Sequence, residues 1–294
     1  MNNKLISNNF NTVLHPHSNI LNSIFHIPII IQETQALSKR LFIQLTRRLV
    51  TLLSGIVQPL LWLILFGALF SNISGDQFNM TTKYNNFLSA GIIAFTAFTG
   101  GLNSGLAIIF DREFGFFNRL LTSPLSSRFS VFIASAYFIA TVTLGQIICI
   151  LFFTELSGLH IPSIQGFFII LNIIFVITLG ITLISIALAF LLPGHIQLLA
   201  LILIINLPVL FSSTALAPLS IMPNWLQVVA SLNPLTYAIE VIRHVYLSPD
   251  LILISPIIST AWGELSIGQI FFNLIELDLL IIIVLFQFLK NKFK

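Results

Sequence analysis

Six continuous runs of apolar residues constrain what this chain can fold into. They lie at about residues 49–70, 87–110, 129–153, 166–192, 196–216 and 270–289. A helix needs roughly 20 mostly apolar residues to cross a bilayer, and an unpaired backbone group in lipid is costly, so each run must be helical. The runs are continuous rather than alternating, which excludes an eight-stranded barrel. The sequence therefore predicts an all-α integral membrane protein with six transmembrane helices.

The composition agrees with a protein whose solvent is lipid. Of the 294 residues, 56% are hydrophobic and 8% are charged, whereas a soluble domain is typically about 25% charged. A net charge of +3 gives little support to nucleic-acid binding. The 28 phenylalanines, with abundant Ile and Asn, suggest an AT-rich genome. We therefore expect a multi-pass protein of a plastid (chloroplast) membrane or, otherwise, of a bacterial inner membrane.

The basic residues predict the orientation of the spans. With the N-terminus inside, only Lys83 and Arg243 of the 13 Lys and Arg residues fall on the outer side. The reverse orientation would place all the others outside, which the positive-inside rule disfavours. Both termini are therefore expected on the cytoplasmic side of the membrane domain, which spans residues 49–290.

The segment before the first span is expected to contain an interfacial helix. Residues 1–26 form a polar tail, and along residues 27–48, up to the start of the first span, Leu37, Leu41, Leu45 and Leu49 recur every four residues while the basic residues lie off that line. This pattern predicts an amphipathic helix on the inner membrane surface. A simple basic anchor and a specific docking role both fit it.

The segment between the last two spans is expected to re-enter the membrane or lie at its outer interface. It is too apolar for a free loop and too rich in proline for a span. Trp225 and Tyr237 are placed at the headgroup level, and Glu240 and Arg243 can pair on one helix face. The apolar stretch 251–258 is short and contains a proline, so we expect it to be interfacial as well.

Two features inside the predicted spans leave alternatives open. The second span carries small residues at helical spacing, at Ala90, Ala94, Ala97, Gly101 and Gly105. These residues allow close helix approach, either at a dimer seam or within the subunit.

The last span carries two acids, Glu276 and Asp278. They lie about 200° apart around a helix, so they cannot form a carboxylate pair. At least one should face protein or a wet pathway. A substrate-path or proton role and helix–helix hydrogen bonding by a protonated acid both remain open.

The motifs of several protein classes are absent from the sequence. It has no G-x-x-x-x-G-K-[ST] loop, so it cannot bind and hydrolyse ATP in that way. The six histidines are scattered, which argues against a metal site. No nucleophile elbow occurs.

Three stretches resemble ABC-2 type permeases, the membrane subunits of one class of ATP-binding-cassette exporters. The charged run 111–125 is similar to the segment between their second and third spans. Residues 59–67 resemble their first span, particularly in the drug-exporter-like branch. Residues 232–243 resemble the segment before their last span. The AT-rich composition adds a similarity to the ABC-2 permeases of red-lineage plastid genomes. The residues of the outer motif are Asn233, Pro234, Tyr237, Glu240 and Arg243.

The resemblance implies a transport subunit that is not itself an enzyme. Two permease subunits would form a homodimer, and two separate ATPase subunits would dock beneath them. ATP and Mg would be bound by the partner ATPase, so no cofactor is expected in this chain. The substrate would be hydrophobic or amphiphilic and would be exported.

The resemblance also implies that the charged run is a coupling helix set against the ATPase. Arg112 and Arg119 are seven residues apart and would share one helix face, with Asp111 and Glu113 at its start. Pro124 would end the helix. The aromatic residues expected to fill an apolar groove of the ATPase are Phe114, Phe116 and Phe117. A solvated loop that only anchors the topology is the alternative.

Two other classes of protein remain open. One is an ATP-independent assembly or scaffold protein of the membrane. The other is a polytopic membrane enzyme, for which Glu276 and Asp278 are the candidates that the sequence offers.

Overall fold

The computed structural model describes residues 27–47, 49–70, 84–122, 129–156, 163–247, 256–260 and 263–292. Most of these residues are helical. The elements are α1 (Ile27–Thr46), α2 (Leu49–Leu69), α3 (Tyr84–Glu113), α4 (Phe116–Thr122), α5 (Phe129–Leu156), α6 (Ile164–Leu191), α7 (His195–Phe211), the 3-10 helix η3 (Leu219–Ile221), α8 (Asn224–Leu232), α9 (Pro234–Leu247), β1 (Pro256–Thr260), β2 (Gly263–Ser266) and α10 (Ile267–Lys292).

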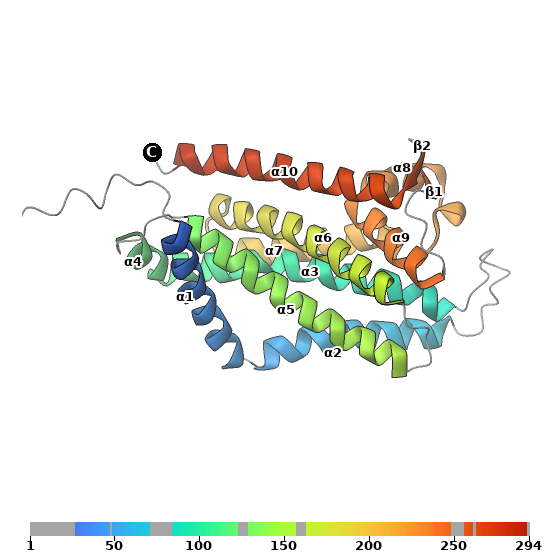
Figure 1. Cartoon of the computed structure of the whole chain (residues 1–294), viewed down its shortest axis with the longest axis horizontal. Coiled ribbons are helices and arrows are strands. Elements are labelled where there is room, and N and C mark those ends of the chain that lie inside the picture. The colour runs from blue at the N-terminus through green and yellow to red at the C-terminus, as the bar shows by residue number, and fades with distance from the viewer. Residues whose placement is uncertain are drawn as a thin grey trace, which may run out of the picture.

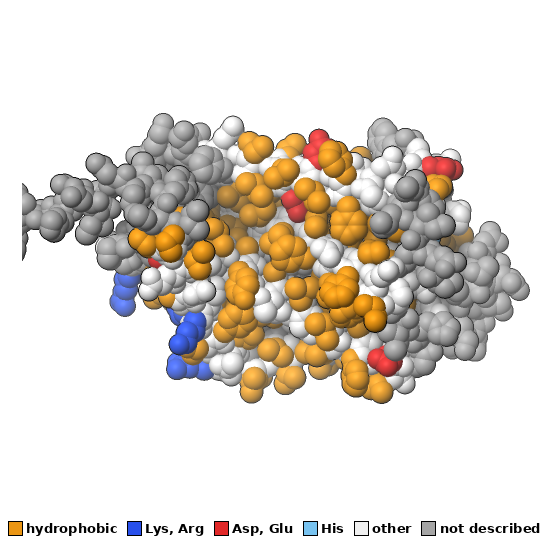
Figure 2. Space-filling view, in the orientation of Figure 1, with side chains coloured by type: hydrophobic (Ala, Val, Ile, Leu, Met, Phe, Trp, Pro, Cys, Tyr) orange, Lys and Arg blue, Asp and Glu red, His pale blue; other side chains and the backbone are white. Residues whose placement is uncertain are grey.

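The long helices lie lengthwise between two ends of the molecule (Figure 1). One end holds α1, α4 and the C-terminal end of α10, and we call it the α4 end. The other holds α8, α9 and the two strands, and we call it the α9 end. Figure 2 shows hydrophobic side chains over the middle of the molecule and Lys and Arg side chains near α1.

Within the residues that the structure describes, five helices are long and apolar enough to cross a membrane: α2, α3, α5, α6 and α10. The run predicted as a sixth span, 196–216, forms α7 with 17 residues, which is about 25 Å at 1.5 Å per residue. The helix ends at Phe211 because the hydroxyls of Ser212 and Ser213 accept and donate local hydrogen bonds that compete with it. Ser213 Oγ donates to the carbonyl of Leu210 at 2.6 Å and accepts from the amide of Ala215 at 3.3 Å.

Helix α3 is the centre of the fold and packs against α2, α5, α6, α7 and α9. Its small residues Ala90, Ala94 and Ala97 are fully buried inside the chain. A Cβ added at Gly101 would lie 2.9 Å from Cβ of Ile181 on α6. The line of small residues therefore packs within the subunit rather than at a dimer seam.

Helix α1 turns its apolar side toward protein. Leu41 is buried, the ring of Phe42 meets that of Phe138 on α5 at 5.0 Å, and Ser130 Oγ donates to the Glu33 carboxylate at 2.7 Å. The leucine line of α1 stops at the turn before α2, since Leu49 already belongs to α2. The predicted tail, 1–26, lies outside the described residues, and an interfacial position of α1 stays a prediction.

A short β-hairpin is added to the otherwise helical fold of the described residues. Strands β1 and β2 pair antiparallel, with Thr260 opposite Gly263, so residues 256–258 of the stretch 251–258 are part of a strand, and the interfacial position expected for that stretch stays a prediction. Residues 251–255 lie outside the described ranges. The β-branched residues Ile257, Ile258 and Thr260 favour a strand, and Gly263 takes the positive φ of +127° that a side chain would resist. Ile258 packs its side chain into the core.

Candidate functional site

The charged segment folds as the end of α3 followed by a separate short helix. Gly115 has φ of +74°, a conformation that ends helices because glycine has no Cβ to clash. The amide of Phe114 donates to the carbonyl of Phe110 at 2.9 Å, and that of Gly115 to the carbonyl of Arg112 at 3.3 Å. The prediction that Arg112 and Arg119 share one helix face is therefore wrong. Asp111 and Glu113 lie at the end of α3 rather than at the start of a coupling helix.

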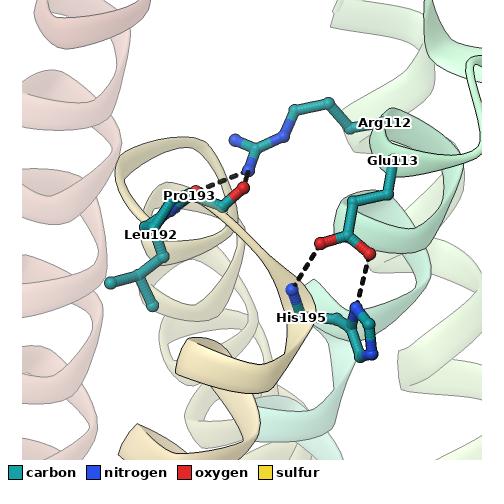
Figure 3. A network of polar contacts seen from close by, with 5 residues as sticks. All are labelled: Arg112, Glu113, Leu192, Pro193 and His195. Carbon is teal, nitrogen blue, oxygen red and sulfur yellow. Dashed lines mark hydrogen bonds and ion pairs between the residues drawn. The ribbon is translucent and has the colours of Figure 1, made fainter.

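Arg112 binds the C-terminal end of α6. Its guanidinium donates to the carbonyl of Ala189 at 2.8 Å, to that of Leu192 at 2.5 Å and to that of Pro193 at 2.8 Å. Figure 3 shows the last two contacts. The last carbonyls of a helix lack intrahelical partners and carry partial negative charge, so a cation here satisfies both needs.

Glu113 binds the N-terminal end of α7 (Figure 3). Its Oε1 accepts from the backbone amide of His195 at 2.7 Å, and its Oε2 lies 2.5 Å from His195 Nδ1. Gly194 makes this approach possible, since a Cβ there would lie 2.7 Å from Oε1. A carboxylate at a helix N-terminus complements the helix dipole. Arg112 and Glu113 thus hold the turn between α6 and α7 from both sides, and we call this pair the α6–α7 clamp.

Asp111 faces the other way and pairs with Arg40 of α1. The Arg40 guanidinium also lies 4.0 Å from the ring centroid of Phe116 on α4, which adds a cation–π attraction. Helix α1 is therefore joined through one side chain to the end of α3 and to α4. The sequence did not indicate that Arg40 pairs with Asp111; it showed only that Arg40 lies off the leucine line.

The three phenylalanines proposed for an ATPase groove differ in exposure. Phe117 is buried against the ring of Phe190 on α6, with centroids 5.5 Å apart, so it is not available to a partner. Phe116 lies under Arg40. Phe114 is 77% exposed, and Arg119 is also exposed. Pro124 lies outside the described residues. Of the described members of the predicted coupling set, Glu113, Phe114 and Arg119 are exposed, and the Glu113 carboxylate is already bound to His195.

The outer motif begins with a helix cap. Asn233 is buried; its Oδ1 accepts from the amide of Leu235 at 3.0 Å and its amide group donates to the carbonyl of Val209 at 2.9 Å. Pro234 follows as the first residue of α9, where a missing N–H costs nothing. Tyr237 Oη donates to the carbonyl of Ser231 at 2.5 Å. These residues turn the chain from α8 into α9 and join it to the end of α7.

Arg243 forms a buried junction between three elements. It is 7% exposed, pairs with Glu240 on its own helix and donates to the carbonyl of Thr214 at 2.7 Å. Its guanidinium carbon lies 3.6 Å from the ring centroid of Phe87 on α3. Burial lowers the pKa of Arg243, while the neighbouring carboxylate of Glu240 counteracts that shift. A buried arginine is tolerable only when it is paired and hydrogen-bonded. Nη1 and Nη2 of Arg243 meet these requirements, whereas its Nε is buried without a hydrogen-bond partner.

The two acids of α10 do not meet. Glu276 is exposed on the surface of the isolated chain, whereas Asp278 is half-buried and faces α6, where a Cβ at Gly180 would overlap its carboxylate. This agrees with their angular separation and leaves a joint acid–base role without support. Within the described ranges, no three His, Cys, Asp or Glu side chains gather as metal ligands.

Comparison with known proteins identifies a family. The pattern of the ABC-2 type transporter family matches residues 32–247. A protein of Porphyra purpurea named "Putative transport permease ycf38" is 53% identical over 263 residues, which are 90% of each chain. Proteins of the same name from Pyropia yezoensis and Cyanophora paradoxa are 51% and 49% identical, over 90% of this chain and 90% and 91% of their own. The predicted resemblance is confirmed: this chain belongs to the ABC-2 type transporter family.

Proposed function

We propose that the chain is the permease subunit of an ABC-2 type exporter, driven by ATP that a separate subunit hydrolyses. The permease works as a homodimer and moves a hydrophobic or amphiphilic substrate. Family membership supports the transport role, and the absence of a phosphate loop from these 294 residues supports an ATPase on a separate chain.

The observation that carries the proposal is that α4 has one side bound to the rest of the chain and one side exposed. One side of this short helix is anchored to the chain through Phe116 and Phe117. The other side exposes Asn118 and Arg119, and Phe114, two residues before α4, is exposed as well. An aromatic and an arginine side chain are the types that most often dominate binding energy at interfaces. We infer that this side, which we call the α4 face, binds the ATPase.

The distribution of charge supports an inner position for the α4 end. Lys39, Arg47 and Arg119 are exposed side chains of elements at this end, and basic residues are enriched on the cytoplasmic side of membrane proteins. The C-terminal end of α10 lies at the same end (Figure 1). This supports a topology of six crossings, with the short α7 as the fifth in order. The AT-rich composition and the algal relatives support a plastid membrane.

Co-purification tests the proposal directly. The full chain, tagged at its C-terminus, is isolated in a mild detergent, and the bound proteins are identified by mass spectrometry. We expect an ATPase with a phosphate loop, and we expect the double variant Phe114→Ala/Arg119→Ala to bind it at least tenfold less, since two interface anchors of about 1 kcal/mol or more are removed. Trp225→Ala on α8, an equally exposed aromatic at the α9 end, is the control and should retain the partner.

Two results would contradict the proposal in different ways. Absence of any ATPase beside the wild-type chain would favour an ATP-independent assembly or scaffold protein. Equal binding by the wild type and the double variant would show that the ATPase docks elsewhere than on the α4 face.

A further inference from the structure

We propose that Arg243 is a positioning residue for transport, which fastens the outer segment of the permease to the far end of α3. Helix α3 is the same helix that holds the α6–α7 clamp at the α4 end. The inference rests on the proposed function, because it assigns to Arg243 a part in carrying a movement from the ATPase side to the outer side.

The first step is the set of elements that meet at Arg243. Its side chain belongs to α9, its hydrogen bond reaches Thr214 in the connection after α7, and its planar face lies over Phe87 of α3. Tyr84, one turn from Phe87 on α3, donates from its hydroxyl to the carbonyl of Leu216 at 3.2 Å. Two side chains of α3 therefore hold the connection 212–216, one directly and one through Arg243.

The second step is the need for arginine at this position. A guanidinium is planar and has separate nitrogens, so it can bind a carboxylate, a carbonyl and an aromatic face at once. A lysine would keep the charge, but it has no plane to stack on Phe87 and only one nitrogen to share between Glu240 and Thr214. Arg243→Lys thus removes the link between elements while it leaves the charge in place.

The third step is the continuity of α3 between the two ends. Its 30 residues extend about 45 Å, and no proline interrupts them. Near its middle the amide of Gly105 donates to Ser185 Oγ on α6 at 3.0 Å, and Ser185 Oγ donates to the carbonyl of Leu102. These bonds and the close contact at Gly101 make α3 and α6 a packed pair.

The consequence is a mechanical connection between the ends of the molecule. At one end the α3–α6 pair carries the clamp and, through Gly115, the α4 face. At the other end it carries the outer segment through Tyr84, Phe87 and Arg243. A displacement of α4 by the ATPase therefore reaches α9 and the connection 212–216 in part through Arg243, beside the bond from Tyr84 and the packing of α9 against α3.

A reporter at the outer segment tests this without knowledge of the substrate. Ser220 is exposed in η3, and Cys149 is the chain's single cysteine. In the background Cys149→Ser, Ser220→Cys is labelled with a membrane-impermeant maleimide. The chain is used in membranes together with its co-purifying ATPase, with and without ATP and orthovanadate. ATP hydrolysis by the complex is measured in parallel.

We expect a several-fold change in the labelling rate at position 220 on vanadate trapping. In Arg243→Lys this change should be lost while ATP hydrolysis continues, and in Tyr84→Phe it should be reduced. Glu264→Gln, which neutralises an exposed acid of β2 at the same end, is the control and should respond as the wild type does.

The possible outcomes are separable. A wild-type response in Arg243→Lys overturns the inference and leaves the proposed function intact. Absence of an ATPase from the wild-type preparation overturns the proposed function, and the inference fails with it. If Arg243→Lys lowers the amount of folded protein, Tyr84→Phe and Phe87→Leu decide the matter, since they leave the Glu240–Arg243 pair in place. An unchanged response in both overturns the inference.

Discussion

The two ends of this permease each depend on an arginine, but they use it in different surroundings. Arg112 at the α4 end is half-buried and donates to backbone carbonyls at the end of α6. Arg243 at the α9 end is 7% exposed and is matched by a carboxylate and an aromatic ring. Water can replace lost contacts at the first site and is excluded from the second. We therefore call the contacts of Arg112 the adjustable joint and those of Arg243 the fixed joint, because water can replace lost contacts only at the first.

The largest predicted effect is the loss of one partner from the buried pair. In Arg243→Met the carboxylate of Glu240, whose side chain is 15% exposed, loses its counter-charge, and we expect a loss of up to about 3–5 kcal/mol in the free energy of unfolding. Thermal or denaturant unfolding of the chain in detergent micelles measures it. The double variant Glu240→Gln/Arg243→Met should lose less than the single variant. A single variant as stable as the wild type would show that the pair contributes nothing to the fixed joint.

A second prediction concerns the α3–α6 contact that connects the two ends. In Gly101→Ala the new methyl group would lie 2.9 Å from Cβ of Ile181 and 3.1 Å from the carbonyl oxygen of Thr178, so the helices must separate. Overpacking of this kind costs about 1–3 kcal/mol, again read from unfolding in detergent. Gly145→Ala on α5 is the matched control, because nothing lies within 4 Å of a Cβ there. Equal stability of the two variants would contradict the tight contact.

The third prediction addresses the adjustable joint at the α4 end. Glu113→Ala removes the cap of α7, whereas Glu113→Gln keeps an acceptor for the amide of His195 and loses only the charge. We expect hydrogen exchange in the segment 192–198 to be fastest in Glu113→Ala, intermediate in Glu113→Gln and slowest in the wild type. Peptide-resolved exchange by mass spectrometry gives the order. Identical rates in the three proteins would remove Glu113 from the clamp, and exchange in α9 should not change in either variant.

Much of the architecture follows from the sequence, because helix length and hydropathy are local properties. The bilayer imposes a length, so the apolar runs predicted most of the long helices within a few residues. The run that began at 196 was the exception, since hydroxyl side chains after Phe211 compete locally for backbone bonds. The hairpin at Pro256–Ser266 was not predicted, because the hydrophobic pattern of such short strands cannot be distinguished from that of an interfacial segment.

The site was less predictable, because its contacts join residues that are distant in sequence. The spacing of Arg112 and Arg119 suggested that one helix contains both, but the helix ends at the break around Gly115. A glycine after a basic last turn is a sequence signal for such a helix end. No spacing rule connects Arg40 with Asp111 or Phe87 with Arg243. Only the Glu240–Arg243 pair, three residues apart on one helix, was accessible from the sequence.

The smallest predicted effect on stability is that of Phe114→Ala, and a comparison with Phe117→Ala separates the exposed side of this segment from its buried side. Phe114 and Phe117 belong to the same segment, but Phe114 is 77% exposed and Phe117 is buried against α6. We expect Phe117→Ala to lose about 3–5 kcal/mol in the free energy of unfolding, since it leaves a cavity in the core. Phe114→Ala should stay within about 0.5 kcal/mol of the wild type, measured side by side in the same detergent. A Phe114→Ala variant that binds the ATPase poorly at unchanged stability separates the docking role of the α4 face from its folding. A loss of stability as large as that of Phe117→Ala would instead make Phe114 part of the fold and leave Arg119 as the outward residue of the predicted set.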